Sequence, residues 1–393
     1  MNNRQLFLQH VAQTSDAPMA LEIVKAQGMY MWDAGGKQYL DLIAGISVCN
    51  IGHCHPAVVK AIKEQAETYM HLLVYGEFVQ SPQVAYAKYL TDHLPAGLNS
   101  VYFTNSGSEA TEGAMKLAKR HTGRTEIIAF KNSYHGSTQG SLSIIGDEYW
   151  RNAYRPLLPD VQHLQHNSMD MLGQITERTA CVIAETIQAE AGVLAPEKTW
   201  LQALRKRCTE TGTLLVLDEI QCGLGRNGTL WAFEQYDVVP DILLTGKALG
   251  GGMPLGAFIA SREVMWSLTN QPVLGHITTF GGHPVACAAG LAGMKALMEE
   301  NMTADIPAKE KLFLELLKHP KIKAVRSRGL MLAVELEDFP AVQKVIAHCI
   351  ANGVITDWFL FAANCIRIVP PLIINEEEIR KACAVILAGL NTL

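Results

Sequence analysis

Two charged side chains come directly after apolar runs of this sequence. Lys247 follows "DILLTG" and Asp218 closes "TLLVLD". A buried lysine with a depressed pKa suits Schiff-base chemistry. From these residues alone the lysine could also bind phosphate or mark where a strand surfaces. The aspartate could be a metal ligand, part of a structural ion pair, or the partner of a cationic ligand atom, because an unpaired buried charge is costly.

A turn of small residues offers a place for an anion. In "TNSGSEATEGAMKLA", Ser106, Gly107 and Ser108 lie between an apolar run and a predicted helix. Small residues let a ligand approach the backbone, and the free N–H groups of a helix N-terminus favour phosphate. An ordinary serine cap in a tight turn would give the same residues. Both interpretations stay open for this stretch by itself.

An aromatic pair follows another apolar run. Tyr134 and His135, in "KNSYHGST", could offer a flat surface to an aromatic ligand. A phosphate cup, an aromatic plate, a buried acid and a lysine are together what pyridoxal phosphate requires of a site.

Other ligand classes fit less well. Gly246 precedes Lys247, but the first glycine of a P-loop is missing and Ala248 stands where the hydroxyl residue should be. The G-x-G-x-x-G fingerprint is absent from the first strand–helix turn. In "GHCHP", two histidines flank Cys54, but neighbouring residues cannot all converge on one ion, so we expect no metal.

The composition is that of an ordinary globular protein. The chain has 393 residues, is 49% hydrophobic and carries a net charge of -5 with acids and bases interspersed, which gives no footprint for nucleic acid. No apolar run is long enough to span a membrane, and the first residues contain no signal-peptide core. Nine scattered cysteines without a C-x-x-C indicate reduced thiols, so we expect a cytoplasmic protein.

The elements that must position these residues alternate between strand and helix. Apolar strands and amphipathic helices, two of them closed by Gly123 and Gly212, predict a mainly parallel α/β sheet covered on both faces. Ligands bind at the carboxyl ends of such strands. The expected strands are "SVYFT", "TEIIAF", "TACVIAET", "GTLLVLDE", "PDILLTG" and "PLGAFIAS".

The two ends of the chain have a different pattern. "GMYMWDAGGKQYLDLIAGISV" predicts an N-terminal hairpin, and the region after the helix "HPVACAAGLAGMKALMEEN" predicts an α+β unit. We expect an N-terminal segment at 1–50 that joins a small domain at 286–393, with a large ligand-binding domain at 51–285.

Eight motifs in order resemble the class III pyridoxal-phosphate-dependent aminotransferases of the acetylornithine and ornithine type. They are "YLDLIAGISVCNIGHCHP", "TNSGSEATEGAMKLA", "YHGST", "ETIQAEAGV", "LLVLDEIQCGLGR", "LLTGKALGGGMPLGA", "TTFGGHPVACAA" and "IRIVPPL". The resemblance implies fold type I, with a mainly parallel seven-stranded sheet in the large domain and a smaller α+β domain. It also implies pyridoxal 5′-phosphate as the cofactor.

The matched motifs imply roles at the cofactor. Lys247 resembles the Schiff-base lysine that also moves the substrate proton, Asp218 the partner of the ring nitrogen, and Gln221 the partner of the phenolic oxygen. Thr279 resembles a threonine that reaches the phosphate from the neighbouring subunit, which implies a homodimer with shared active sites. The other implied cofactor-binding residues are Ser106, Gly107, Ser108, Tyr134, His135 and Glu185.

The match at the substrate end is uneven. Arg367 resembles the arginine that binds the α-carboxylate of glutamate or 2-oxoglutarate, and Glu190 the glutamate that pairs with it while the donor is bound. Ser137 stands where relatives carry a donor-binding arginine, whose charged fork serine cannot replace. Ile46 matches the acetylornithine type rather than the tyrosine of ornithine aminotransferases.

Arg151 and Arg155 are candidates for the missing donor-binding arginine, although a helix surface also explains them. We expect a homodimeric aminotransferase that works by a ping-pong mechanism. Its donor is a primary, terminal amine such as N-acetylornithine or another ω-amino compound, and its acceptor is 2-oxoglutarate. The alternatives are a mutase or lyase on the same scaffold, a pyruvate-using ω-amine transaminase, or a binding protein that has lost activity.

Overall fold

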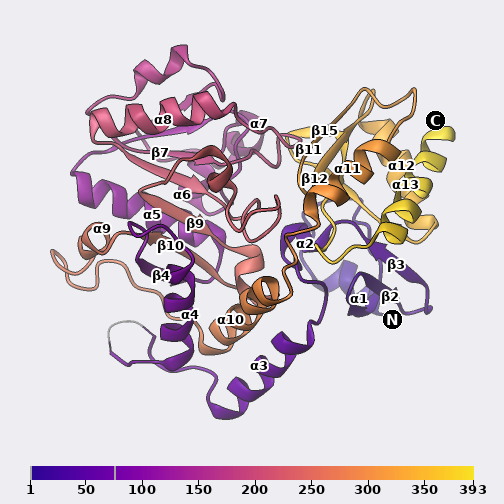
Figure 1. Cartoon of the computed structure of the whole chain (residues 1–393), viewed down its shortest axis with the longest axis horizontal. Helices are drawn as coiled ribbons and strands as arrows, with labels where there is room; N and C mark the ends of the chain where they lie inside the picture. The colour runs from indigo at the N-terminus through magenta and orange to yellow at the C-terminus, as the bar shows by residue number, and fades with distance from the viewer. Residues whose placement is uncertain (1, 75–76) are drawn as a thin grey trace.

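A seven-stranded sheet forms the centre of the larger lobe in the computed structural model, which describes residues 2–74 and 77–393 (Figure 1). The strands, in sheet order, are β4 (Ser100–Thr104), β10 (Gly256–Ala260), β9 (Ile242–Thr245), β8 (Leu214–Asp218), β7 (Thr179–Glu185), β5 (Glu126–Phe130) and β6 (Val161–Leu164). Strand β10 is antiparallel to both of its neighbours, and all other pairs are parallel. The prediction of a mainly parallel sheet is confirmed; only β6, a half-polar edge strand, was missed.

Helices cover both faces of this sheet. Alternate residues of β5 enter opposite cores: Ile127 lies in one apolar cluster and Ile128 in the other. Helix α5 (Gly107–Thr122) contributes to the first cluster, and α8 (Lys198–Thr211) contributes to the second. A parallel sheet buried in this way has strands that read as continuous apolar runs.

Two helices end where their glycines predict. Gly123 closes α5 with a φ of 70°, and Gly212 closes α8 with a φ of 61°. Both lie in the left-handed region that favours glycine, and their N–H groups bond carbonyls of the last helical turn. At its other end α5 is capped by Ser106, whose hydroxyl accepts a hydrogen bond from the Glu109 N–H.

The N-terminal strands share a sheet with the C-terminal region. This sheet runs β1 (Ile23–Gln27), β2 (Tyr30–Asp33), β3 (Gln38–Asp41) and β13 (Val354–Ile355), and β13 is parallel to β3. A third, antiparallel sheet has the order β11 (Ala324–Arg328), β12 (Met331–Glu335), β15 (Ala362–Ile368) and β14 (Asp357–Phe359). Figure 1 shows both chain ends, indigo and yellow, in the same smaller lobe.

The remaining helices connect and cover these sheets. Helix α10 (Pro284–Glu299) packs against α3 (Pro56–Thr68) and α4 (Ser81–Asp92). The others are α1 (Asn3–His10), α2 (Ala44–Ser47), α6 (Gln139–Ser143), α7 (Glu148–Arg151), α9 (Arg262–Trp266), α11 (Ile306–Leu316), α12 (Phe339–Ala351) and α13 (Glu376–Asn391). None of the helices described is long and apolar enough to cross a membrane.

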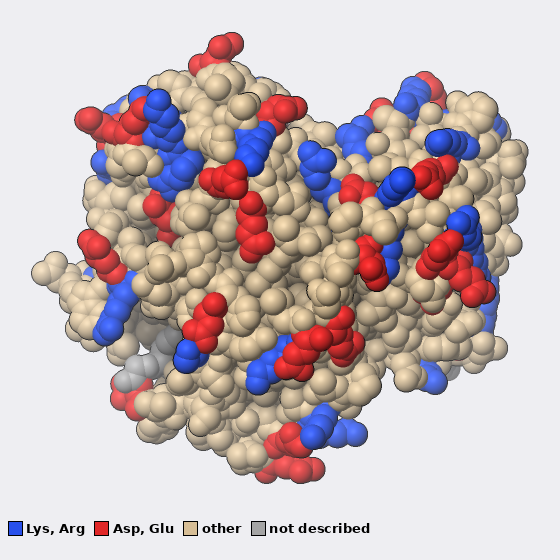
Figure 2. Space-filling view, viewed as in Figure 1, with Lys and Arg blue, Asp and Glu red and all other residues tan. Residues whose placement is uncertain are grey.

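The surface and the cysteines agree with the composition. Figure 2 shows acidic and basic side chains interspersed over the face that it draws. All nine cysteines are free thiols, and seven of them, from Cys181 onward, are buried.

Candidate active site

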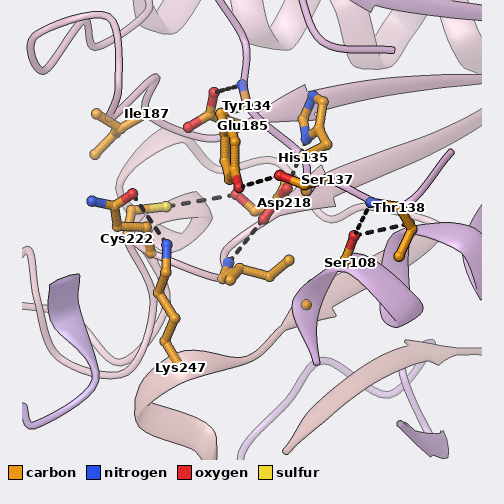
Figure 3. Close-up of a pocket in the computed structure, with 14 residues that line it drawn as sticks. Ser108, Tyr134, His135, Ser137, Thr138, Glu185, Ile187, Asp218, Cys222 and Lys247 are labelled. Atoms are coloured by element: carbon orange, nitrogen blue, oxygen red, sulfur yellow. Dashed lines mark hydrogen bonds and ion pairs between the residues drawn. The ribbon is translucent and has the colours of Figure 1, made fainter. Parts of the chain in front are cut away.

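The carboxyl ends of the parallel strands open into a cavity of about 480 Å³ (Figure 3). Strand β8 ends in Asp218 and the neighbouring strand β9 leads into Lys247, so adjacent strand ends bring both residues to one cavity. The residues that line it include Gly107, Ser108, Tyr134, His135, Gly136, Ser137, Thr138, Glu185, Ile187, Gln221 and Cys222.

Lys247 points into this cavity from a short 3₁₀ helix, η4 (Lys247–Gly250). Its Nζ donates a hydrogen bond to Gln221 Oε1 at 3.3 Å. Desolvation lowers the pKa of Lys247 below its ordinary value, while Glu190 and Asp218 partly oppose this shift. A larger fraction of neutral amine is what a nucleophilic lysine needs. The residue also has a φ of 49°, which is unusual for a side chain other than glycine.

Asp218 is held by two donors. Its Oδ2 lies 2.7 Å from His135 Nδ1, and its Oδ1 accepts from the Ile220 N–H at 2.9 Å. The carboxylate and the imidazole are both buried. The expectation that His135 offers a flat surface stays a prediction; its ring also pairs with Asp218, which gives the buried acid a partner. His135 still lines the cavity.

Small residues line the opposite end of the cavity. Gly107 is the first residue of α5, and the Ser108 hydroxyl lies 2.9 Å from the hydroxyl of Thr138. A Cβ at Gly107 would lie only 2.8 Å from the side chain of Ile220. Ser106 does not line the cavity, since its hydroxyl is the cap of α5. The helix N-terminus and the hydroxyls form a cradle suited to a phosphate.

Tyr134 lies over the middle of the cavity (Figure 3). Its backbone N–H donates to Glu185 Oε1 at 2.9 Å, and its hydroxyl lies 3.1 Å from the Ser137 hydroxyl. Glu185 also accepts from the Ala189 N–H at 3.0 Å, and burial raises the pKa of this glutamate to about 7. Glu185 thus anchors the loop that carries Tyr134.

The polar groups of the cavity fit pyridoxal phosphate. Within the described part of the chain, Gln221 Nε2 and His135 Nε2 are buried without a hydrogen-bond partner. An amide N–H with no partner beside Lys247 suits a phenolic oxygen, and a carboxylate such as Asp218 suits a protonated ring nitrogen. The cradle at Gly107 and Ser108 suits the phosphate.

A second cavity of about 390 Å³ shares Tyr134 and Lys247 with the first. Arg367, at the end of β15, donates from both terminal nitrogens to Glu190, with NH1–Oε1 at 2.8 Å and NH2–Oε2 at 2.9 Å. Both side chains are almost fully buried, and Glu190 and Asp357 hold the pKa of Arg367 above its ordinary value despite desolvation. Ile46 lines the same cavity.

Besides Ser106, three of the predicted residues lie outside both cavities. Arg151 donates to the Ser143 carbonyl and pairs with Glu148, and Arg155 pairs with the same glutamate. Neither arginine is therefore free to replace the one missing at Ser137. Thr279 is exposed and does not line the cavity of its own chain.

The motif "GHCHP" forms no metal site. His53 pairs with Asp41 at 2.7 Å, while His55 pairs with Glu300 at 3.1 Å, so the two imidazoles have different partners. Cys54 is exposed. Among the residues that the structure describes, no group of His, Cys, Asp and Glu could hold a metal ion.

Asp357 lines the second cavity and was not anticipated. It lies on β14 opposite Arg367 of β15. The acid stands ten positions before the arginine, and no sequence spacing shows that the two strands pair in this register. The one sequence feature that could have indicated Asp357 as a site residue is its position as a charged residue between the apolar runs "GVIT" and "WFLF".

We predict that Gly136→Ala weakens cofactor binding. Gly136 has a φ of 123°, and a Cβ there would collide with Ser108. The substitution should displace the Ser108 hydroxyl from the cradle, raise the dissociation constant of pyridoxal phosphate about tenfold or more, and cost about 1–3 kcal/mol of stability. Fluorescence titration of the apoprotein measures the constant. Gly36→Ala, at a φ of 82° with open space, is the control for backbone strain alone; equal cofactor affinity in both variants contradicts the prediction.

Comparison with known proteins agrees with this site. The family model for class-III aminotransferases matches residues 11–390. An acetylornithine aminotransferase of Methanopyrus kandleri is 41% identical over 387 residues, which cover 97% of each chain. Another, of Bacillus cereus, is 36% identical and covers 93% of this chain and 94% of its own length.

A solved structure has the same fold. An ornithine aminotransferase of Toxoplasma gondii, which is described with partial occupancy of PLP at its active site, superposes with a TM-score of 0.90. The two chains are 30% identical, and the match covers 99% of this chain and 93% of that one. The predictions of the family, of the fold and of the cofactor are confirmed. The chain belongs to the class III aminotransferases, and it is a transaminase of the α/β fold type I that uses pyridoxal 5′-phosphate.

Proposed function

We propose that the enzyme transfers an amino group from a primary, terminal amine to 2-oxoglutarate in two half-reactions of a ping-pong mechanism. The observation that carries this proposal is the bidentate Arg367–Glu190 pair in a cavity that Lys247 also lines. An arginine whose NH1 and NH2 edge is paired with a carboxylate side chain can exchange that carboxylate for one of a substrate.

Bound pyridoxal phosphate supplies an electron sink for the carbanion that forms when the substrate loses its proton. Lys247 would be the base that moves this proton, since it is the amine that reaches the middle of the cavity. Asp218, buried and bonded to His135, would stabilise positive charge on the ring nitrogen. Gln221 would hold the phenolic oxygen through its free amide N–H.

Glu190 decides which substrate meets Arg367. While the pair is closed, the arginine's charge is neutralised, and a donor with no carboxylate beside its reacting amine can enter. When a 2-oxo acid enters, its carboxylate takes the place of Glu190 on the NH1 and NH2 edge. The exchange keeps the two charge-assisted hydrogen bonds on Arg367, but Glu190 must then turn to another partner, because its displaced carboxylate would otherwise be an uncompensated buried charge.

We expect Arg367→Lys to impair the acceptor half-reaction selectively. Lysine keeps the charge but loses the two-pronged fork, so the KM for 2-oxoglutarate should rise about tenfold to a hundredfold. Stopped-flow spectroscopy with each substrate alone separates the two half-reactions. Glu190→Gln is the matched variant: it removes the competing charge and should lower the KM for the 2-oxo acid. Equal losses in both half-reactions of Arg367→Lys would refute the assignment.

A pyruvate-using ω-amine transaminase is the second candidate. The observation that favours it is Ser137, which gives no charge to a second carboxylate. The acceptor half-reaction, run once with pyruvate and once with 2-oxoglutarate, decides between the two candidates. A higher kcat/KM for pyruvate would mean that pyruvate is the acceptor, and Arg367 would then bind the carboxylate of pyruvate.

We further propose that the active enzyme is a homodimer whose subunits share active sites. Exposed apolar side chains surround Thr279, which does not enter the cavity of its own chain. They are Val273, Leu274, Ile277 and Phe280. Such a patch is typical of a surface that another chain covers.

A further inference from the structure

Asp357 brings a second carboxylate to the substrate cavity. It lies on β14, directly opposite Arg367 of β15, and lines the cavity that also contains Ile46, Tyr134 and Lys247. The Asp357 side chain is 18% exposed to solvent. A carboxylate in this position can therefore touch a substrate that reaches Lys247.

Arg367 already has its partners without Asp357. Glu190 takes both terminal nitrogens, and NH2 also donates to the Trp358 carbonyl at 2.7 Å. The guanidinium carbon lies 4.6 Å from the centre of the Phe359 ring. These contacts fix the plane of the guanidinium and satisfy its charge.

The contact between Asp357 and Arg367 is close but poorly aligned. Oδ1 lies 2.9 Å from Nε, yet both atoms are without a hydrogen-bond partner among the residues described, because the N–H does not point at the oxygen. A buried carboxylate oxygen that accepts no hydrogen bond is costly unless a ligand supplies the donor.

The charges of the cavity leave this carboxylate in excess. Lys247 and Arg367 are the only lysine and arginine among the described residues that line either cavity, and Lys247 is engaged by the cofactor. Glu190 and Asp357 both contact Arg367, so these three side chains together carry one excess negative charge on the donor's path. Desolvation raises the pKa of Asp357 to about 6, against the opposing effect of Arg367, so the group is mostly ionised at neutral pH.

We propose that Asp357 binds a second cationic group at the far end of the amine donor. The preferred donor is then a diamine or a similarly basic amine, not an amine with a distal carboxylate. This inference rests on the proposed transaminase half-reaction and adds the chemical class of its donor. Ser137 agrees with it, because the exposed hydroxyl there can receive no carboxylate by charge pairing.

Three donors of matched length test the charge of the tail. Cadaverine carries a distal cation, pentylamine a neutral end and δ-aminovalerate a distal anion. In single-turnover reactions with the holoenzyme, we expect kcat/KM of the donor half-reaction for cadaverine to exceed that for pentylamine roughly tenfold or more, with δ-aminovalerate the poorest. Equal values for cadaverine and pentylamine, or a preference for the anion, would overturn the proposal.

Binding without turnover gives an independent readout. Tertiary analogues cannot react with the cofactor, so calorimetry on the holoenzyme with tetramethylcadaverine and dimethylpentylamine measures recognition alone. The dication should bind roughly tenfold tighter or more. If the enzyme turns over pentylamine but shows no preference for the dication, the proposed function stands and the inference about the donor falls. If no primary amine reacts while the dication still binds tighter, the proposed function falls and the inference that the site prefers a dication stands.

The variant Asp357→Asn tests whether this side chain causes the preference for a distal cation. Asparagine is nearly isosteric with aspartate but uncharged, so the variant should lose the advantage of the dication in both measurements. Asp305→Asn is the control, since Asp305 is exposed, makes no capping bond and lines neither cavity. If Asp357 serves only to orient Arg367, Asp357→Asn would instead raise the KM for the 2-oxo acid and leave the donor ranking unchanged, and that result rejects the proposal.

Discussion

Replacing Lys247 by alanine should abolish covalent attachment of the cofactor and reduce transamination by roughly a thousandfold or more. In our proposal, the variant loses the amine that carries the cofactor and the base that moves the substrate proton, and general-base catalysis alone contributes about a hundredfold to ten-thousandfold. Borohydride reduction followed by intact-mass spectrometry measures attachment, because the wild-type chain retains the reduced cofactor after denaturation and the variant chain should not. Amine-donor assays measure turnover.

Lys309→Ala is the matched control for loss of a half-buried lysine. Its Nζ donates to the Leu372 carbonyl at 2.7 Å, and burial lowers the pKa of this lysine as it does that of Lys247. This variant should lose some stability but keep the covalent cofactor. Retention of the cofactor by Lys247→Ala, or near wild-type turnover, would show that another amine performs the chemistry.

Asp218→Asn should reduce kcat on the order of a hundredfold to a thousandfold while the protein stays folded. The amide keeps the shape but loses the negative charge that faces the ring nitrogen and His135. Buried charges placed where charge develops in a reaction are usually worth this much. We expect the loss in the rate of proton removal from the donor, which stopped-flow spectroscopy with a deuterated amine isolates, more than in cofactor affinity.

The neighbouring residue supplies the control. Glu219 is also a buried carboxylate at the end of β8, but it accepts from Thr186 and from the N–H groups of Ala232 and Phe233, and it does not line the cavity. Burial raises the pKa of Glu219 to about 7, so glutamine is a mild change there. Glu219→Gln should alter the melting temperature more than kcat. If both variants lose kcat equally, the effect of Asp218 is structural.

Local patterns explain why much of the fold was predictable. Strands such as "TLLVLD" are buried on both sides and read as apolar runs, and glycines close α5 and α8 because only they adopt a φ near 60–70° freely. Short or half-polar strands escaped prediction. Strand β13 has two residues and β14 has three, so their pairing with β3 and β15 depends on distant partners rather than on their own pattern.

The functional site, like the fold, was only partly predictable from the sequence. Lys247, Asp218 and the turn at Gly107 could be predicted because each follows an apolar run at a strand end, where parallel topology collects ligand-binding residues. The pairing of His135 with Asp218 could not be predicted, because the two residues are 83 positions apart and only the fold brings them together.

The family, the cofactor and the order of strands and helices follow from local patterns and long motifs in the sequence. Which charged groups meet depends on the folded chain. Asp357 was brought opposite Arg367 by the register of β14 and β15. The charge balance of a cavity is a sum over side chains from distant segments, and a sequence does not contain the distances that enter that sum.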